Sequence, residues 1–206
     1  EKREEAIKFL EEYVYVKKGV AKEIYEYMKE QKDFSEVPDI NTFVIEKIKE
    51  EKEYMIFHSM YGRRVNDALA RAYAFAAARL KYRDIEMGIN DNGFFIAGES
   101  LDAEKIVKWV KVEDLKAILK EAIEKTEVLA RRFRHCAARS LMILRNYKGR
   151  EKSVGKQQVH SFFLLSAVKK ISNEFPILRE ARREVFEDLM DIKNAEKVLL
   201  AMKSGE

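Results

Sequence analysis

The short segments typical of β-strands all lie before Gly98, and this division constrains the fold more than any other feature of the sequence. Each segment is rich in β-branched or aromatic residues, whereas the apolar residues after Gly98 recur at helical spacing. The predicted strands are Thr42–Lys47, Tyr54–Ser59, Ile85–Ile89 and Phe94–Ala97. An Asn-Asp-Asn-Gly stretch, residues 90–93, separates the last two and is typical of a hairpin turn.

Helical spacing of apolar residues predicts the remaining elements. The predicted helices are residues 1–14, 20–31 (separated from the first at Gly19), 62–80, 105–110, 112–125, 126–147, 156–173, 176–190 and 194–202. With 206 residues, 47% of them hydrophobic, the chain can bury a core and form one or two domains. We therefore predict an α+β fold, with a small antiparallel sheet and packed helices in residues 1–100 and an all-helical second subdomain in residues 101–206.

Several site types are disfavoured by composition and spacing. One cysteine excludes a disulfide framework and a Cys-based zinc site, and it fits a reducing, cytoplasmic location. No apolar run approaches the roughly 18 residues of a membrane span, so no membrane partner is predicted. The three histidines are far apart in the sequence, which disfavours a metal site. No pair of carboxylates and no nucleophile–base pair is better explained by catalysis than by a structural role. We predict neither catalytic nor metal-binding residues.

The formal net charge of +4 is unevenly distributed along the chain. Nine Lys and Arg residues against one acid give residues 131–156 a net charge of +8, which leaves −4 for the other 180 residues. A basic segment within an acidic remainder is typical of a surface that binds phosphates. The glycines at 149 and 155 do not form an ATP-binding loop, because five residues separate them and Gln157 follows the lysine.

A helical wheel of residues 129–145 separates an apolar arc from a basic one. The basic arc contains Arg131, Arg132, Arg134, His135, Arg139 and Arg145. No acid lies on it, although a solvated helix usually interleaves Glu with its Arg. We therefore favour nucleic acid as the partner of this face, and the alternative is an acidic patch elsewhere in the fold. Lys148 extends the basic set, and Tyr147 offers a ring for base stacking.

A second anion anchor is predicted at the start of the helix over residues 62–80. Arg63 and Arg64 lie where free backbone N–H groups and the helix dipole favour an anion. The alternative to anion binding is a local ion pair, because Asp67 is at helical spacing from both Arg64 and Arg71.

Four separated motifs carry a resemblance to a known family. They are residues 56–69 (IFHSMYGRRVNDAL), 90–94 (NDNGF), 131–139 (RRFRHCAAR) and 175–180 (FPILRE). In this order they resemble the C-terminal, DEAD/H-associated region of archaeal large helicase-related (Lhr-type) proteins, over roughly Glu12–Ile192. Tyr61 stands where the family pattern leads us to expect Phe.

The resemblance implies a superfamily-two helicase in which two RecA-like motor domains and a winged helix precede this module. Such helicases unwind DNA or DNA–RNA hybrids with 3′-to-5′ polarity, using ATP and magnesium. The chain has no motor motifs, so both cofactors are expected on motor domains outside it, and none is expected on this segment. Because residue 1 is Glu rather than Met, we expect a piece of a longer helicase.

The expected function is that of an accessory domain which contacts the translocating strand through its phosphates. Its expected partners are single-stranded DNA or RNA or a DNA–RNA hybrid, together with the motor and winged-helix domains of the parent helicase. The alternative is a protein-interaction scaffold whose basic helix docks on the motor domains and orients them.

Overall fold

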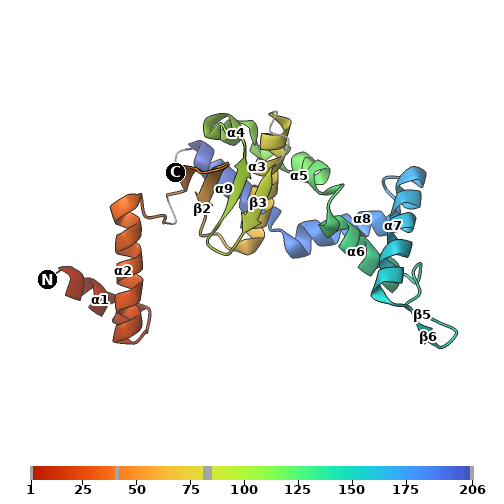
Figure 1. The fold of residues 1–206 in the computed structure, drawn as a ribbon, viewed down its shortest axis with the longest axis horizontal. Helices are drawn as coiled ribbons and strands as arrows, with labels where there is room; N and C mark the ends of the chain where they lie inside the picture. Colours follow the sequence, from red (N-terminus) through yellow and green to blue (C-terminus); the bar gives the residue numbers. More distant parts are fainter. Residues whose placement is uncertain (1, 40–41, 81–84, 205–206) are drawn as a thin grey trace. The chain divides into compact units, whose positions relative to one another are not determined.

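The computed structural model describes residues 2–39, 42–80 and 85–204 (Figure 1). The chain divides into two compact units, Glu1–Val44 and Ile45–Glu206. The predicted subdivision near residue 100 falls inside the second unit.

The first unit is a pair of contacting helices, α1 (Lys2–Tyr13) and α2 (Lys18–Phe34). The predicted separation at Gly19 is wrong, because Gly19 lies in the first turn of α2. The chain turns earlier, at Tyr15, whose φ of 55° is left-handed and interrupts the helix. The predicted first helical residue, Glu1, lies outside the described residues.

The second unit contains a four-stranded sheet in the order β1-β2-β4-β3. Its strands are β1 (Val44–Lys49), β2 (Glu53–His58), β3 (Glu86–Ile89) and β4 (Gly93–Gly98). The central strand β4 pairs antiparallel with β2 and β3, which confirms the predicted hairpin. Gly93 is required at its turn, because an added Cβ would lie 2.2 Å from the carbonyl oxygen of Phe57.

Helix α3 packs against this sheet and joins the two halves of the sequence. The rings of Phe57 on β2, Tyr73 on α3 and Phe94 on β4 form one stacked cluster, with the Phe57 centroid 5.1 Å from that of Tyr73 and 4.4 Å from that of Phe94. The elements around this core are α3 (Arg63–Arg79), α4 (Ala103–Trp109), the 3-10 helix η1 (Val112–Asp114), α5 (Leu115–Ile123) and α9 (Ile192–Ser204). Because α3 contacts α4, α5 and α9, residues on both sides of position 100 share one core.

The other helices of the second unit pack on one another. They are α6 (Glu127–Arg139), α7 (Val154–Ile171), α8 (Pro176–Glu184) and the π-helical segment η2 (Val185–Leu189). Helix α6 contacts both α7 and α8. Between α6 and α7 lies a short hairpin of β5 (Asn146–Tyr147) and β6 (Arg150–Glu151) (Figure 1). The predicted α+β class is confirmed, with this hairpin within the helical half.

The prediction of one helix over residues 126–147 is wrong, because α6 ends at Arg139. Leu141 adopts a left-handed φ of 60°, and the N–H of Ile143 bonds back to the carbonyl of Ala137 at 3.0 Å. Apolar residues at 141, 143 and 144 continue the helical spacing, so the sequence contains no stop signal here. No helix in the described ranges is long and apolar enough to cross a bilayer.

Candidate nucleic-acid interface

Helix α6 presents its basic face outward because its apolar face is buried. Thr126 caps the helix by accepting a hydrogen bond from the N–H of Leu129 at 3.5 Å. The buried side chains of α6 are Leu129, Phe133, Cys136 and Ala137. The predicted amphipathic character is therefore confirmed for the part of the segment that is helical.

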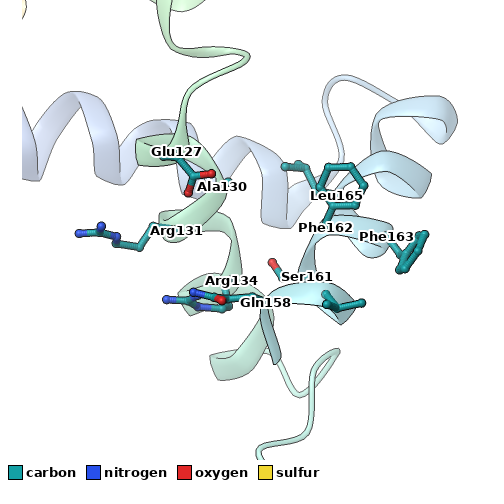
Figure 2. A pocket seen from close by; sticks show the side chains of 10 residues that line it. Glu127, Ala130, Arg131, Arg134, Gln158, Ser161, Phe162, Phe163 and Leu165 are labelled. Atoms are coloured by element: carbon teal, nitrogen blue, oxygen red, sulfur yellow. The ribbon is translucent and has the colours of Figure 1, made fainter. Parts of the chain in front are cut away.

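Arg131 and Arg134 are the cations of α6 that have no ion-pair or hydrogen-bond partner among the described residues. Both line a groove of about 680 Å³ between α6 and α7. In Figure 2 their guanidinium groups extend from the same side of α6. This pair is thus free to contact an external anion.

Arg132 and Arg139 differ from that pair, because both bind Glu184 of α8. Arg139 donates a hydrogen bond to this carboxylate, and the Nη1 of Arg132 lies 3.6 Å from its Oε2. The Glu184 side chain is only 6% exposed. For these two residues the structure contains the alternative partner that the sequence left open, an acid elsewhere in the fold. Glu184 lies about 50 positions after these arginines in the sequence, so helical spacing could not predict the ion pairs.

His135 is exposed on the same helix. Partial burial of its ring, together with the neighbouring Arg134 and Arg132, lowers the pKa of His135 below the usual 6.5. The imidazole is therefore uncharged at neutral pH and offers a hydrogen bond to a phosphate or base rather than a positive charge.

Arg145 and Lys148 belong to the hairpin region and not to α6. The carbonyl of Arg145 accepts a hydrogen bond from the N–H of Lys152 at 2.8 Å, just before β5 begins. Lys148 and Gly149, with φ of 50° and 73°, form the tight turn between β5 and β6. The ammonium of Lys148 lies 5.5 Å from the centroid of the exposed Tyr147 ring.

The two arginines of the predicted second anchor have different surroundings. Arg63 is exposed and has no ion-pair partner in the described part of the chain. Arg64 donates hydrogen bonds to the carbonyls of Glu187 and Met190, so its guanidinium connects α3 with η2. Asp67 pairs with Arg71 at 2.6 Å, which confirms the local alternative for Arg71. Neither Arg63 nor Arg64 lines the groove between α6 and α7.

Sequence reasoning missed two aromatic residues of the groove, Phe162 and Phe163 of α7. Each is 67% exposed, and the two rings meet edge-on with centroids 5.9 Å apart. The available signal was an excess of apolar residues on α7, of whose 18 residues only Ser161 and Val168 are buried. The groove thus combines unpaired guanidinium groups with open aromatic rings, the two features that single-stranded nucleic-acid sites use.

The described residues contain no group of three or more His, Cys, Asp or Glu side chains that could hold a metal ion. Burial, with a contribution from Glu184, raises the pKa of the Cys136 thiol to about 11. This thiol is therefore protonated at neutral pH, which is its poorly nucleophilic form.

Comparison with protein families matches residues 37–206 to the DEAD/H associated family. The ATP-dependent helicase Lhr-Core of Methanothermobacter thermautotrophicus is 44% identical over an alignment of 207 positions, which covers 99% of this chain and 24% of that protein. The Lhr helicase/uracil glycosylase of Escherichia coli is 28% identical, and the match covers 82% of this chain and 11% of that protein. The chain spans about a quarter of the length of its archaeal relative.

One solved structure shares the fold over most of the chain. It is the helicase Lhr of Mycobacterium smegmatis bound to ssDNA and AMP-PNP, with a TM-score of 0.81 and 26% sequence identity. The similarity covers 90% of this chain and 24% of that one.

Proposed function

The chain belongs to the DEAD/H-associated family, and from this membership we propose that it is an accessory nucleic-acid-binding domain of an Lhr-type helicase. It contacts the translocating strand through backbone phosphates. The observation that carries the proposal is the pair Arg131 and Arg134, unpaired among the described residues and lining one groove. Arg145, Lys148 and Arg63, all exposed, supply further contacts, and His135 supplies a hydrogen bond.

Phosphate contacts suit a domain that a strand must slide past. They carry no sequence information, so successive nucleotides bind equally well. They also accept DNA, RNA or a hybrid, since all three present the same backbone charge. In this proposal ATP and magnesium act on motor domains outside the chain.

Arg132, Arg139 and Arg64 have a supporting role in this proposal. Their guanidinium groups are engaged by Glu184 and by two backbone carbonyls, so a phosphate has to compete with a partner already in place. They hold α6 and α3 against the elements that follow, and thereby fix the direction in which the free arginines point.

Charge reversal in the 206-residue chain tests the proposal. Arg131→Glu/Arg134→Glu is compared with Lys193→Glu/Lys197→Glu, an equal charge change at two exposed lysines of α9. Fluorescence anisotropy measures binding of a labelled single strand, and circular dichroism confirms that each variant is folded. We expect about a tenfold or greater loss of affinity for the α6 variant and little loss for the α9 variant.

Two results would contradict the proposal. Equal losses in both variants would mean that only the overall charge matters. Absence of binding by the wild-type chain at low salt would instead favour the scaffold alternative, in which the basic face meets an acidic surface of the motor domains.

A further inference from the structure

Helix α7 exposes two adjacent aromatic rings that line the same groove as the free arginines. Phe162 and Phe163 of α7 line one side of this groove, and Arg131 and Arg134 of α6 line the other, with their guanidinium groups extending on the side of α6 away from the rings (Figure 2). Because the planes of the two rings are 73° apart, they offer their faces in different directions. The pair can therefore receive two separate flat groups, whereas a single apolar surface would receive one.

The exposure of these rings is not explained by the packing of the described residues. Ser161 and Val168 are the residues of α7 that are buried. The two phenylalanines that directly follow Ser161 remain two-thirds exposed. Burying a phenyl side chain is normally favourable, so adjacent exposed rings on one helix indicate a surface that another molecule covers.

Phe163 also lines a second hollow, of about 540 Å³, on the other flank of α7. This hollow contains His160 of α7 and Lys152 of the preceding segment. Lys152 has no ion-pair partner among the described residues. Phe163 thus lines two hollows that both contain unpaired cations, Arg131 and Arg134 in one and Lys152 in the other.

We propose that Phe162 and Phe163 form a base-stacking platform that selects unpaired, single-stranded nucleic acid. A strand crosses α7 with its phosphates near Arg131, Arg134 and Lys152 and with bases on the two rings. The inference rests on the proposed function and adds a base contact by which this surface prefers a single strand to a duplex. Charge complementarity favours this occupant over an apolar protein surface, because an apolar surface would bury the unpaired cations of the groove without neutralising them.

Stacking separates single strands from duplexes on physical grounds. Every base has a π-face, so the contact is indifferent to sequence, but the bases of a duplex are already stacked on one another. A duplex therefore meets only the cations of this surface, whereas a single strand meets the cations and the rings.

Strands with and without bases test the platform in the 206-residue chain. Phe162→Ala/Phe163→Ala is compared with Val154→Ala/Ile171→Ala, which removes two exposed apolar side chains of the same helix that line neither hollow. Anisotropy measures the binding of an oligothymidylate and of an abasic strand of equal length. We expect the phenylalanine variant to lose about 5- to 100-fold in affinity for the oligothymidylate.

The abasic strand supplies the decisive comparison. The phenylalanine variant should bind it as the wild type does, while Arg131→Ala/Arg134→Ala should weaken the binding of both strands. The Val154→Ala/Ile171→Ala variant should bind both strands normally. Five of the six substituted side chains are exposed, and Arg134 is half-buried without an ion-pair partner among the described residues, so none of these variants should lower the unfolding midpoint appreciably.

Failure of the platform is distinguishable from failure of the proposed function. If the phenylalanine variant binds the oligothymidylate as the wild type does, or loses affinity equally for both strands, the platform is overturned while phosphate binding stands. Normal binding of the oligothymidylate by the phenylalanine variant would instead indicate that a protein surface covers the two rings. If the wild-type chain binds neither strand, the proposed function itself fails.

Discussion

Glu184 and its two arginines should respond asymmetrically to mutation. We predict that Arg132→Ala/Arg139→Ala destabilises the chain more than Glu184→Gln does, although both changes remove the same ion pairs. The reason lies in what each variant leaves behind. The first leaves a carboxylate that is 6% exposed, and the second leaves guanidinium groups that are 27% and 58% exposed.

Burial sets the size of the two effects. An unpaired carboxylate inside a protein costs about 3–5 kcal/mol in the free energy of unfolding. Exposed guanidinium groups are solvated by water, so losing their partner costs about 1 kcal/mol. For a chain of this size the difference of about 2–4 kcal/mol corresponds to a gap of roughly 4–16 °C in the unfolding midpoint.

Urea unfolding at pH 7, followed by circular dichroism, measures the two free energies directly. The single cysteine adds a local probe, because Cys136 is buried and its Sγ lies 3.3 Å from Nη2 of Arg139. Its labelling by a thiol reagent should accelerate most in the double arginine variant. Equal destabilisation by the two variants, or a greater effect of Glu184→Gln, would refute the assignment of Glu184 as a buried anchor.

Three further predictions concern other parts of the second unit. Asn66→Ala should lower the free energy of unfolding by about 2–4 kcal/mol in urea titrations, because the buried amide donates to the carbonyl of Ser59 at 2.9 Å and accepts from its hydroxyl at 2.6 Å; an effect below 1 kcal/mol would contradict this. The pKa of His135 is lowered and a bound phosphate favours the imidazolium, so affinity for a single strand should rise as the pH falls below about 6.5. At constant ionic strength, His135→Asn should abolish that rise. Alkylation of Cys136 should be very slow at pH 8 and accelerate toward pH 11, and fast reaction at pH 8 would show that the thiol is not held in the buried site.

The sheet was predictable because its signals are local. β-branched and aromatic runs, together with the Asn-Gly turn before Phe94, identify strands without knowledge of the rest of the chain. The outward direction of Arg131 and Arg134 was predictable for a similar reason, since helical spacing alone places them outside the apolar arc that contains Phe133.

Other parts of the site depend on contacts that sequence spacing does not encode. Glu184 meets Arg132 and Arg139 only when α8 packs on α6, and no pattern near any of the three residues indicates it. The end of α6 depends on Leu141, a residue type that rarely adopts a left-handed conformation. The exposure of Phe162 could not be predicted either, because an apolar residue on a helix is usually buried.

The most direct test of phosphate contact by the α6 face is the dependence of affinity on salt. Log K for a single strand, plotted against log[salt], should fall linearly for the wild-type chain, with a slope of about −0.7 per phosphate contacted. Arg131→Ala/Arg134→Ala removes two such contacts, so its slope should be shallower by about 1.4. A variant slope equal to that of the wild type would show that neither arginine contacts a phosphate and would contradict the account.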